Sequence, residues 1–387
     1  MSSLPKYLFL STAIFFNLFI VATTGFVPLG RCFHSSVLIG TQLYFLGGIG
    51  SDEIFYLDVS LPFDSKKLLW TDLTTNSLIP VNSAFATSCV GGQNNKTIFL
   101  FEHHKKNDDK LKYTITYNFD TINQKWDIPT IKNPDQIPPV RQGINAACDP
   151  NGKMYIFGGH NPHRHFKRSH NDMYVLDSLN LSWNQYLASL SIIQPTVRSD
   201  YTATILQSSI IVYIGGTNDV YKSNEIDMND ISIFDTNAGT WTSMIADNDN
   251  VTIQARRFHT AVLTSDGLII IYGGASNNNS EVPKPLLAVL DTKPKIYKWY
   301  RAEFSRGKFD GKNNLNVNVY ILDAKSFLWV TSTSQNASNS TPSNVNPSNE
   351  TPSSTISSST IPSTSISSTN STLINNTPDV RLVAGLS

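Results

Sequence analysis

The sequence lacks any excess of charge, because 30 lysines and arginines balance 30 aspartates and glutamates in 387 residues. We therefore expect no nucleic-acid partner, since phosphate binding needs a surplus of basic side chains that displaces counterions. Cysteine is scarce as well, and the odd count of three leaves at least one thiol unpaired. The sequence also lacks a Gly-x-Ser-x-Gly elbow, a zinc signature and a phosphate loop, so no common catalytic motif indicates an enzyme.

What the sequence does have is a long repeat, with aspartates spaced 62, 57, 58 and 56 residues apart over its first five copies. In each copy an aspartate ends a short apolar run and a tryptophan follows, and all six tryptophans are used in this way. The pairs are Asp58 and Trp70, Asp120 and Trp126, Asp177 and Trp183, Asp235 and Trp241, Asp291 and Trp299, and Asp323 and Trp329.

Two further pieces recur in four of the copies. An Arg-x-x-His-like segment opens the copy, and a run of β-branched and aromatic residues typical of a strand ends in Gly-Gly. Glycine at such a place permits positive φ or the close approach of a neighbouring chain. The second copy has FLFEHHKK where Gly-Gly is expected, but its aspartate and tryptophan identify it as a repeat. The arginines are Arg31, Arg141, Arg198 and Arg256, and the glycines are Gly47, Gly48, Gly158, Gly159, Gly215, Gly216, Gly273 and Gly274.

Taken together, Gly-Gly, the aromatic-x-x-Asp pattern and the tryptophan resemble the kelch repeat. The resemblance covers residues 26–331 and implies an all-β fold, a kelch-type β-propeller with one repeat per blade. Four short antiparallel strands per blade bury both faces of each sheet when the sheets stack radially. In this arrangement we expect the tryptophans to fill the wedges between blades.

The pattern predicts about six blades, of which the sixth is incomplete. Asp291 and Asp323 are only 32 residues apart, and no Arg-x-x-His or Gly-Gly segment lies between them. This blade would keep its last two strands and lack its first two. Either residues 26–30 or the GKFDGKN stretch close the ring, or a deletion has removed the missing strands; we favour a deletion, because residues 26–30 are too few to form two strands.

The two ends of the chain differ from the repeats. Residues 1–25 resemble a signal peptide, since Lys6 precedes a 16-residue apolar stretch that ends in small residues. A membrane anchor is the weaker alternative, because a span needs about 20 apolar residues. Residues 332–387 are rich in Ser, Thr, Asn and Pro, which predicts a disordered, glycosylated tail. We therefore expect a secreted or extracellular protein with no membrane span in the mature chain, and association with a cell wall is an open alternative.

Sequons for N-glycosylation agree with export. The pattern Asn-x-Ser/Thr is weak when it occurs alone, but an exported chain carrying many copies should be a glycoprotein. Four acceptors fall in the propeller, namely Asn95, Asn180, Asn250 and Asn278. Five more fall in the tail, namely Asn336, Asn339, Asn349, Asn370 and Asn375.

The cysteines are expected to remain unpaired within the chain. Cys32, Cys89 and Cys148 fall in the opening strands of the first three blades. Packed sheets lie about 10 Å apart, whereas a disulfide needs Cα atoms within about 7 Å. The sequence thus predicts no intramolecular disulfide.

One loop concentrates possible ligand-binding side chains. Half of the eight histidines lie after the Gly-Gly of the third blade (Gly158, Gly159), in a run that also contains basic residues. Histidines can ligate a metal, but the neighbouring positive charges would repel a cation. We therefore interpret the run as a binding loop for an acidic or sugar-bearing partner, formed by His160, His163, Arg164, His165, Lys167, Arg168 and His170.

Two classes of function remain. The first is a secreted or cell-surface binding module that recognises a protein or a glycan through its blade loops. The second is a secreted carbohydrate-active enzyme, because galactose oxidase is similar in its kelch propeller, and extracellular fungal kelch proteins with Ser/Thr-rich tails resemble this architecture. That enzyme's copper needs two histidines and two tyrosines, one of them crosslinked to a cysteine, and no matching set is recognisable. We therefore expect no cofactor, no metal site and no catalytic residue, and a shared fold alone does not establish function.

Overall fold

The computed structural model describes most of the repeat region and neither end of the chain. The described residues are 25–60, 64, 67–80, 83–102, 114–162, 169–186, 195–219, 224–248, 250–276, 282–301, 321–323 and 328–330. The expected signal peptide up to residue 24, the GKFDGKN stretch and the expected tail at 332–387 lie outside these residues.

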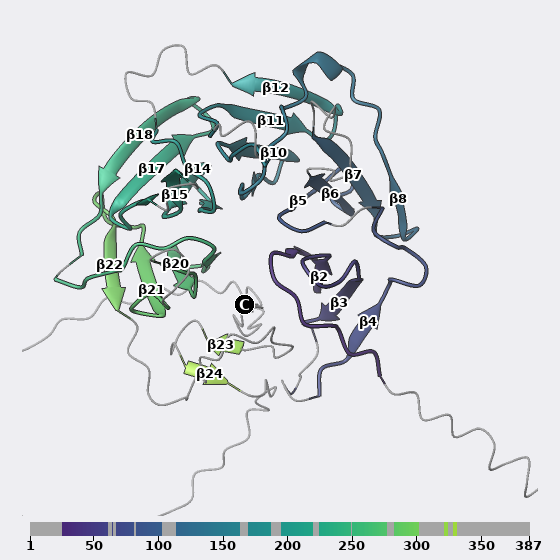
Figure 1. Cartoon of the computed structure of the whole chain (residues 1–387), viewed down its shortest axis with the longest axis horizontal. Helices are drawn as coiled ribbons and strands as arrows, with labels where there is room; N and C mark the ends of the chain where they lie inside the picture. Colours follow the sequence, from purple (N-terminus) through teal and green to yellow (C-terminus); the bar gives the residue numbers. More distant parts are fainter. Residues whose placement is uncertain are drawn as a thin grey trace, which may run out of the picture.

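Five four-stranded antiparallel sheets follow one another around a ring, so the all-β propeller expected from the sequence is confirmed (Figure 1). Among the described residues there is no α-helix, only the 3-10 turn η1 (Pro134–Gln136). Blade one contains β1 (Ser35–Ile39), β2 (Gln42–Leu46), β3 (Ile54–Asp58) and β4 (Trp70–Asp72). Blade two contains β5 (Thr87–Gly91), β6 (Thr97–Glu102), β7 (Ile115–Asp120) and β8 (Lys125–Asp127). Blade three contains β9 (Ala147–Cys148), β10 (Lys153–Phe157), β11 (Met173–Asp177) and β12 (Ser182–Tyr186).

Blade four carries a small extra hairpin in the loop between its second and third strands. Its sheet contains β13 (Thr202–Ile205), β14 (Ile210–Ile214), β17 (Asp230–Asp235) and β18 (Thr240–Ile245), and the hairpin pairs β15 (Thr217–Asp219) with β16 (Asn224–Glu225). Blade five contains β19 (Thr260–Leu263), β20 (Leu268–Tyr272), β21 (Leu287–Asp291) and β22 (Lys298–Arg301).

The order of strands in each blade fixes where its loops lie. First strands of neighbouring blades contact one another, so they lie innermost, and later strands lie progressively further from the centre (Figure 1). Because the strands are antiparallel, the segment before the first strand and the loop after the second emerge on one face of the ring. We call this the mouth face; the other two hairpin turns of every blade lie on the opposite face.

Apolar packing between sheets holds neighbouring blades together. Second strands are buried on both faces, as in β14 (IIVYI) and β20 (LIIIY), each with four of its five residues buried. One continuous cluster joins blades two and three, where Trp183 is 0% exposed and its ring lies 5.3 Å from that of Phe101. Similar clusters join blades one and two, three and four, and four and five. The apolar runs of the repeat therefore form the interfaces of the ring.

The repeated aspartate has a local structural role at the hairpin between the third and fourth strands. The carboxylate of Asp177 accepts backbone N–H bonds from Leu179 and Asn180 at 3.0 and 2.9 Å. Asp58, Asp120, Asp235 and Asp291 accept equivalent bonds from residues two positions further on. These bonds hold the turn in place, which is why an aspartate ends each apolar run.

Blade two is a full sheet although it has no Gly-Gly, so counting this repeat as a blade is confirmed. A sixth blade is not confirmed. The two strands expected for it, β23 (Ile321–Asp323) and β24 (Leu328–Val330), pair as an antiparallel hairpin between blades five and one (Figure 1). Residues 302–320, which precede this hairpin, lie outside the described part of the chain. The structure therefore shows five four-stranded blades and one additional hairpin.

The expectation that no disulfide forms was wrong. Cys89 of β5 and Cys148 of β9 are joined, and their Cα atoms are 5.7 Å apart. The spacing of about 10 Å applies to sheets packed face to face, but first strands of adjacent blades converge towards the axis and come much closer. Cys32 is a free thiol and precedes β1 instead of lying within it.

The described part of the chain contains no helix that is both long enough and apolar enough to span a membrane.

Replacing Trp183 with alanine should destabilise the propeller by about 3–5 kcal/mol, because it removes a large ring from a fully buried interface between two blades. Chemical denaturation monitored by circular dichroism measures this change. Leu69→Ala is the matched control, since Leu69 is 81% exposed and its loss should change the free energy of unfolding by about 0.5 kcal/mol or less. Equal midpoints for Trp183→Ala and the parent chain would show that the ring does not support the interface.

Candidate functional site

Four buried arginines organise the mouth face. Arg31, Arg141, Arg198 and Arg256 are each at most 1% exposed. In every case Nη1 donates to the carbonyl oxygen of the first glycine of Gly-Gly, at 3.1, 3.0, 3.3 and 3.1 Å respectively. Each arginine therefore ties the segment before the first strand to the loop after the second strand of its own blade.

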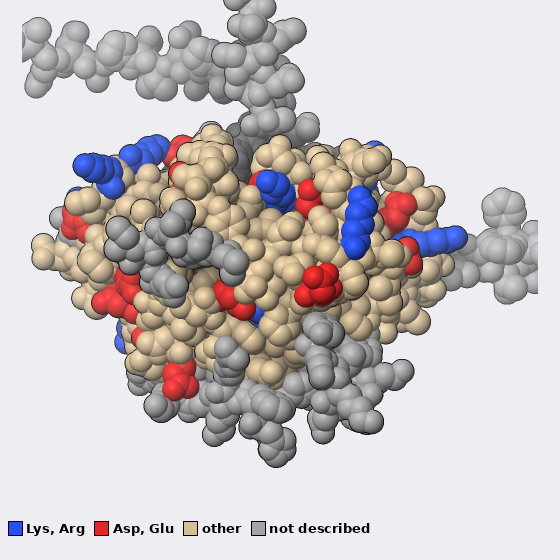
Figure 2. Space-filling view, turned by 90° about the horizontal axis from the view of Figure 1, so that it is seen from above, with Lys and Arg blue, Asp and Glu red and all other residues tan. Residues whose placement is uncertain are grey.

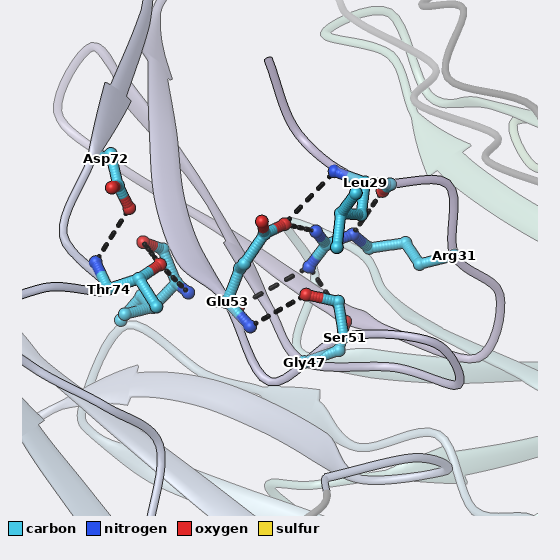
Figure 3. A network of polar contacts seen from close by, with 8 residues as sticks. Leu29, Arg31, Gly47, Ser51, Glu53, Asp72 and Thr74 are labelled. Carbon is cyan, nitrogen blue, oxygen red and sulfur yellow. Dashed lines mark hydrogen bonds and ion pairs between the residues drawn. The ribbon is translucent and has the colours of Figure 1, made fainter. Parts of the chain in front are cut away.

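The guanidinium groups have further partners that differ between blades, although Arg198 Nε is buried without a hydrogen-bond partner among the described residues. Arg31 pairs with the carboxylate of Glu53, which also accepts the backbone N–H of Leu29 (Figure 3). Arg141 forms an ion pair with Asp172 at 2.7 Å. Arg198 donates to Ser232 Oγ at 2.9 Å, and Arg256 donates to the Pro285 carbonyl at 2.8 Å. These bonds satisfy charges that burial would otherwise leave uncompensated.

In blades three and four, the first glycine of Gly-Gly lies too close to the backbone of the next blade to carry a side chain. A Cβ on Gly158 would lie 2.5 Å from the carbonyl oxygen of Arg198, and one on Gly215 would lie 2.8 Å from that of Arg256. Blade two has a serine, Ser83, where the other blades have the arginine, and it also lacks Gly-Gly. The arginine and its glycine acceptor are thus present together in four blades and absent together in one.

Two residues after each arginine position, the chain adopts positive φ. These five residues, one from each blade, are Phe33, Phe85, Gly143, Asp200 and Phe258, with φ of 55, 64, 70, 58 and 59°. We call them the belt. Backbone N–H groups link the belt between blades, from Phe85 to Phe33 O at 3.0 Å, from Asp200 to Gly143 O at 2.7 Å and from Phe258 to Asp200 O at 3.0 Å.

Three of the belt side chains form an aromatic cluster. The rings of Phe33 and Phe85 stack with centroids 4.2 Å apart, and Phe258 meets Phe33 edge-on at 5.1 Å. Blades five and one therefore contact each other at the mouth through Phe258 and Phe33. All three rings are partly exposed, so the cluster presents an apolar surface to an incoming ligand.

Asp200 and His160 lie beside this aromatic cluster, around Gly143. A Cβ on Gly143 would lie 2.5 Å from Asp200 Oδ1 and 3.0 Å from His160 Nδ1. Asp200 is 9% exposed, and no described residue hydrogen-bonds to its carboxylate. Burial raises the pKa of Asp200 to about 7, although the charge of Arg257 acts in the opposite direction.

His160 contributes an unused donor to the same place. The amide nitrogen of Gln142 lies 3.0 Å from His160 Nε2 and can only donate, so the proton of the neutral imidazole is on Nδ1. Nδ1 has no hydrogen-bond partner in the described part of the chain. Burial lowers the pKa of His160 to about 4, with further lowering from His170 and Arg257. The mouth face thus holds a carboxylate and a neutral imidazole N–H, and neither has a hydrogen-bond partner among the described residues.

The binding loop expected from the sequence begins at this site. His160 is the first residue of that loop and pairs with Gln142 on one side and with Ser169 on the other. His170 is 9% exposed, and its backbone N–H donates to Gly159 O at 2.8 Å. The other expected ligand-binding residues lie outside the described residues, namely His163, Arg164, His165, Lys167 and Arg168.

The sequons that the structure describes are all exposed. Asn95, Asn180 and Asn250 lie in turns at the surface, and the side chain of Asn180 donates to Asp177 at 2.8 Å. Asn278 and the five tail acceptors, Asn336, Asn339, Asn349, Asn370 and Asn375, fall outside the described ranges. No described atom therefore blocks a glycan at Asn95 or Asn250.

The other described surfaces of the propeller have fewer groups suited to binding a ligand. A shallow pocket of about 390 Å³ lies on the opposite face, between the first turns of blades four and five, and is lined by Leu206, Ser208, Asp266 and Lys293 among others. Within the described ranges no group of three or more His, Cys, Asp or Glu side chains is placed to hold a metal ion. On the side drawn in Figure 2, basic and acidic side chains are interspersed on a mostly uncharged surface.

Sequence reasoning missed the belt, although it identified the arginines that precede it. The belt residues share a backbone conformation and not a residue type, so no residue pattern marks them. The usable signal was the fixed offset of two residues from the repeat arginine, which lies at a sharp turn before an inner strand. Asp200 could have been singled out as a carboxylate at a position held elsewhere by phenylalanine or glycine.

Comparison with known proteins identifies kelch-repeat relatives. The family model described as "KLHDC2/KLHL20/DRC7 Kelch-repeats domain" matches residues 93–311. Kelch domain-containing protein 3 of Homo sapiens is 29% identical over 262 residues, which are 63% of this chain and 64% of the relative. Kelch domain-containing protein 2 of Bos taurus is 24% identical over 280 residues, 67% of this chain and 64% of the relative. The matches thus span less than two thirds of the length of these relatives.

Among solved structures, that of YjhT aligns with a TM-score of 0.49 and 14% identity, over 65% of this chain and 74% of the other. A relationship to extracellular fungal or galactose-oxidase-like proteins is not shown by these matches.

The buried histidines should make the propeller sensitive to mild acid. Burial lowers the pKa of His34 to about 4 and that of His259 to about 3, from an ordinary value of 6.5. Between pH 6.5 and 4 the unfolded chain takes up protons that the folded chain does not, so stability is full above pH 6.5 and falls as the pH drops through this window. Asp200 acts in the opposite direction, because its raised pKa stabilises the folded state as the pH falls below 7, but the three depressed histidines outnumber it.

Thermal unfolding midpoints measured from pH 7.5 to 4 test this expectation. The variant His259→Gln can keep a hydrogen bond to Thr202 Oγ1, which lies 2.9 Å from His259 Nε2, and its midpoint should change less with pH than that of the parent. Identical slopes for the two chains would show that His259 does not contribute to the acid sensitivity.

Proposed function

Because the chain belongs to the KLHDC2/KLHL20/DRC7 Kelch-repeat family, we propose that it is a secreted or cell-surface binding module that holds a protein partner at its mouth. The observation that carries this proposal is the combination of a partly exposed aromatic cluster with two polar groups, the Asp200 carboxylate and His160 Nδ1, that have no hydrogen-bond partner among the described residues. Aromatic side chains beside a few convergent polar groups are typical of sites that bind with specificity.

The construction of the mouth suits recognition. Its floor is fixed by buried arginines and by backbone hydrogen bonds of the belt, whereas the loops after the second strands differ in length and sequence between blades. Variable loops on a rigid scaffold are the usual location of binding residues.

Export is supported by three independent features. The apolar stretch at residues 7–22 resembles a signal peptide. The Cys89–Cys148 disulfide is of the kind that persists in oxidising compartments. Exposed sequons at Asn95 and Asn250 are available for modification.

A glycan is the second candidate ligand, because sugar hydroxyls can donate to the Asp200 carboxylate and accept from His160 Nδ1–H. A glycan array probed with the full chain and with Asp200→Asn separates this candidate from a protein partner. Catalysis of the galactose-oxidase type has no residue set in its favour.

Photo-crosslinking tests whether a partner docks at the mouth. Benzoylphenylalanine replaces Phe85, which lies at the mouth, or Ser208, an exposed residue on the opposite face. Irradiation of the full chain in its own extracellular medium or on its cells should attach a second polypeptide at position 85 and not at position 208. Crosslinking only at position 208, or equally at both, would place the partner elsewhere.

Export predicts a glycosylated, disulfide-bonded protein outside the cell. Removal of N-glycans by a glycosidase should lower the apparent mass of the secreted chain, and Asn95→Gln should lower it by one glycan. Non-reducing peptide mapping should recover Cys89 linked to Cys148. Recovery of unglycosylated chain in the cytosol with Met1 retained would contradict export.

A further inference from the structure

Among the residues that the structure describes, none forms an ion pair or a hydrogen bond with the Asp200 carboxylate. Asp200 is 9% exposed and lies against Gly143. A buried carboxylate is costly unless it is paired or protonated. A folded chain that keeps such a group on its mouth face has a site suited to a positive charge supplied from outside.

We propose that Asp200 and the three belt phenylalanines bind the side chain of a lysine or arginine presented by the partner polypeptide, an inference that rests on the mouth being the docking site. The carboxylate receives the cationic head group, and the rings receive the aliphatic stem. Long basic side chains commonly bury their methylene groups against apolar surface while the charged end finds a polar partner.

The aromatic cluster fits this ligand in a second way. Phe33, Phe85 and Phe258 form one partly exposed cluster of rings on the mouth face. A cation within about 6 Å of a ring face is attracted by the quadrupole of the ring. The mouth already shows this contact, since the Arg257 guanidinium lies 5.3 Å from the centroid of Phe258.

The charges around Asp200 favour a cation over an anion. The titratable groups close to it are Arg257, whose charge lowers the pKa of Asp200, and His160, whose pKa burial lowers to about 4, so that its imidazole is neutral near pH 7. Burial raises the pKa of Asp200 to about 7 in spite of Arg257. Arg257 therefore compensates the ionised carboxylate only in part, and an acidic ligand would be repelled by it.

Binding of a cation should be linked to loss of a proton from Asp200. A basic side chain pairs with the ionised carboxylate, so affinity should rise with pH up to the pKa of the free site and level off above it. At one pH unit below that pKa only about a tenth of the carboxylates are ionised, so affinity should be about tenfold lower than at the plateau. His160, with a pKa of about 4, does not titrate in this range.

The experiment uses three amidated, acetylated pentapeptides of glycine with a central lysine, norleucine or glutamate. Calorimetric titration of the full chain at pH 6 and pH 8 should show saturable binding of the lysine peptide only, about tenfold tighter at pH 8. Buffers that differ in ionisation enthalpy should reveal proton release on binding at pH 7.

Asp200→Asn tests the role of the carboxylate. Asparagine tolerates positive φ as aspartate does, so the belt should keep its conformation, which the thermal midpoint verifies. This variant should bind the lysine peptide at least about tenfold more weakly and lose the pH dependence. Asp52→Asn is the matched control, because Asp52 is an exposed carboxylate in the mouth-face loop of blade one, and it should bind like the parent.

Three results would overturn the inference: equal binding of the norleucine peptide, preferential binding of the glutamate peptide, or unchanged affinity in a folded Asp200→Asn chain. If the partner still crosslinks at position 85 in that case, docking at the mouth stands and only the basic side chain is wrong. If no crosslink forms at position 85 either, the proposed function fails with it.

Discussion

A guanidinium group held inside the protein by backbone carbonyls is the interaction on which this propeller depends. Such a group loses much hydration energy on burial and is stable only when its N–H donors are satisfied. Burial lowers the pKa of Arg256 to about 10, so the group remains charged at neutral pH and keeps its full set of donors. Each guanidinium fixes the position of a glycine carbonyl, and in blades three and four that glycine, Gly158 or Gly215, in turn lies against the backbone of the next blade.

The consequence is a chain of constraints that runs from one blade to the next. At Gly158, the glycine accepts a hydrogen bond from Arg141 in its own blade and is packed against Arg198 in the following blade. Gly159 then donates its N–H to the Arg198 carbonyl at 2.9 Å. Blade two, which has Ser83 instead of an arginine, relies on apolar packing and on the Cys89–Cys148 bridge to blade three.

Much of the fold follows from local sequence rules. The apolar runs, the turn aspartates and the tryptophans repeat in phase, and each acts through neighbours a few residues away, so they indicate the strands, the hairpins and five of the blades. The disulfide could not be anticipated in the same manner, because the distance between Cys89 and Cys148 depends on how closely the inner strands converge in the assembled ring. The incomplete sixth repeat was recognisable as a missing stretch of residues, and its hairpin is present.

The candidate site was only partly predictable for a related reason. His160 was found because histidines cluster in its loop, whereas Asp200, Phe33 and Phe258 lie far apart in sequence and become neighbours only through ring closure. Their common property is backbone conformation, which a residue pattern does not encode. Propensity describes strands well, but a site assembled from one residue per blade is a property of the whole ring.

In the belt, the backbone sets the shape of the mouth and the side chains set its chemistry. Its positions are set by positive φ and by backbone hydrogen bonds, so different side chains can occupy them on the same scaffold. A residue other than glycine held there costs about 1 kcal/mol or more of strain. Glycine would relieve this strain, but it would remove the side chain that lies at the mouth. A propeller of this kind can therefore change what it recognises by single substitutions at five places, while its backbone hydrogen bonds keep the shape of the mouth.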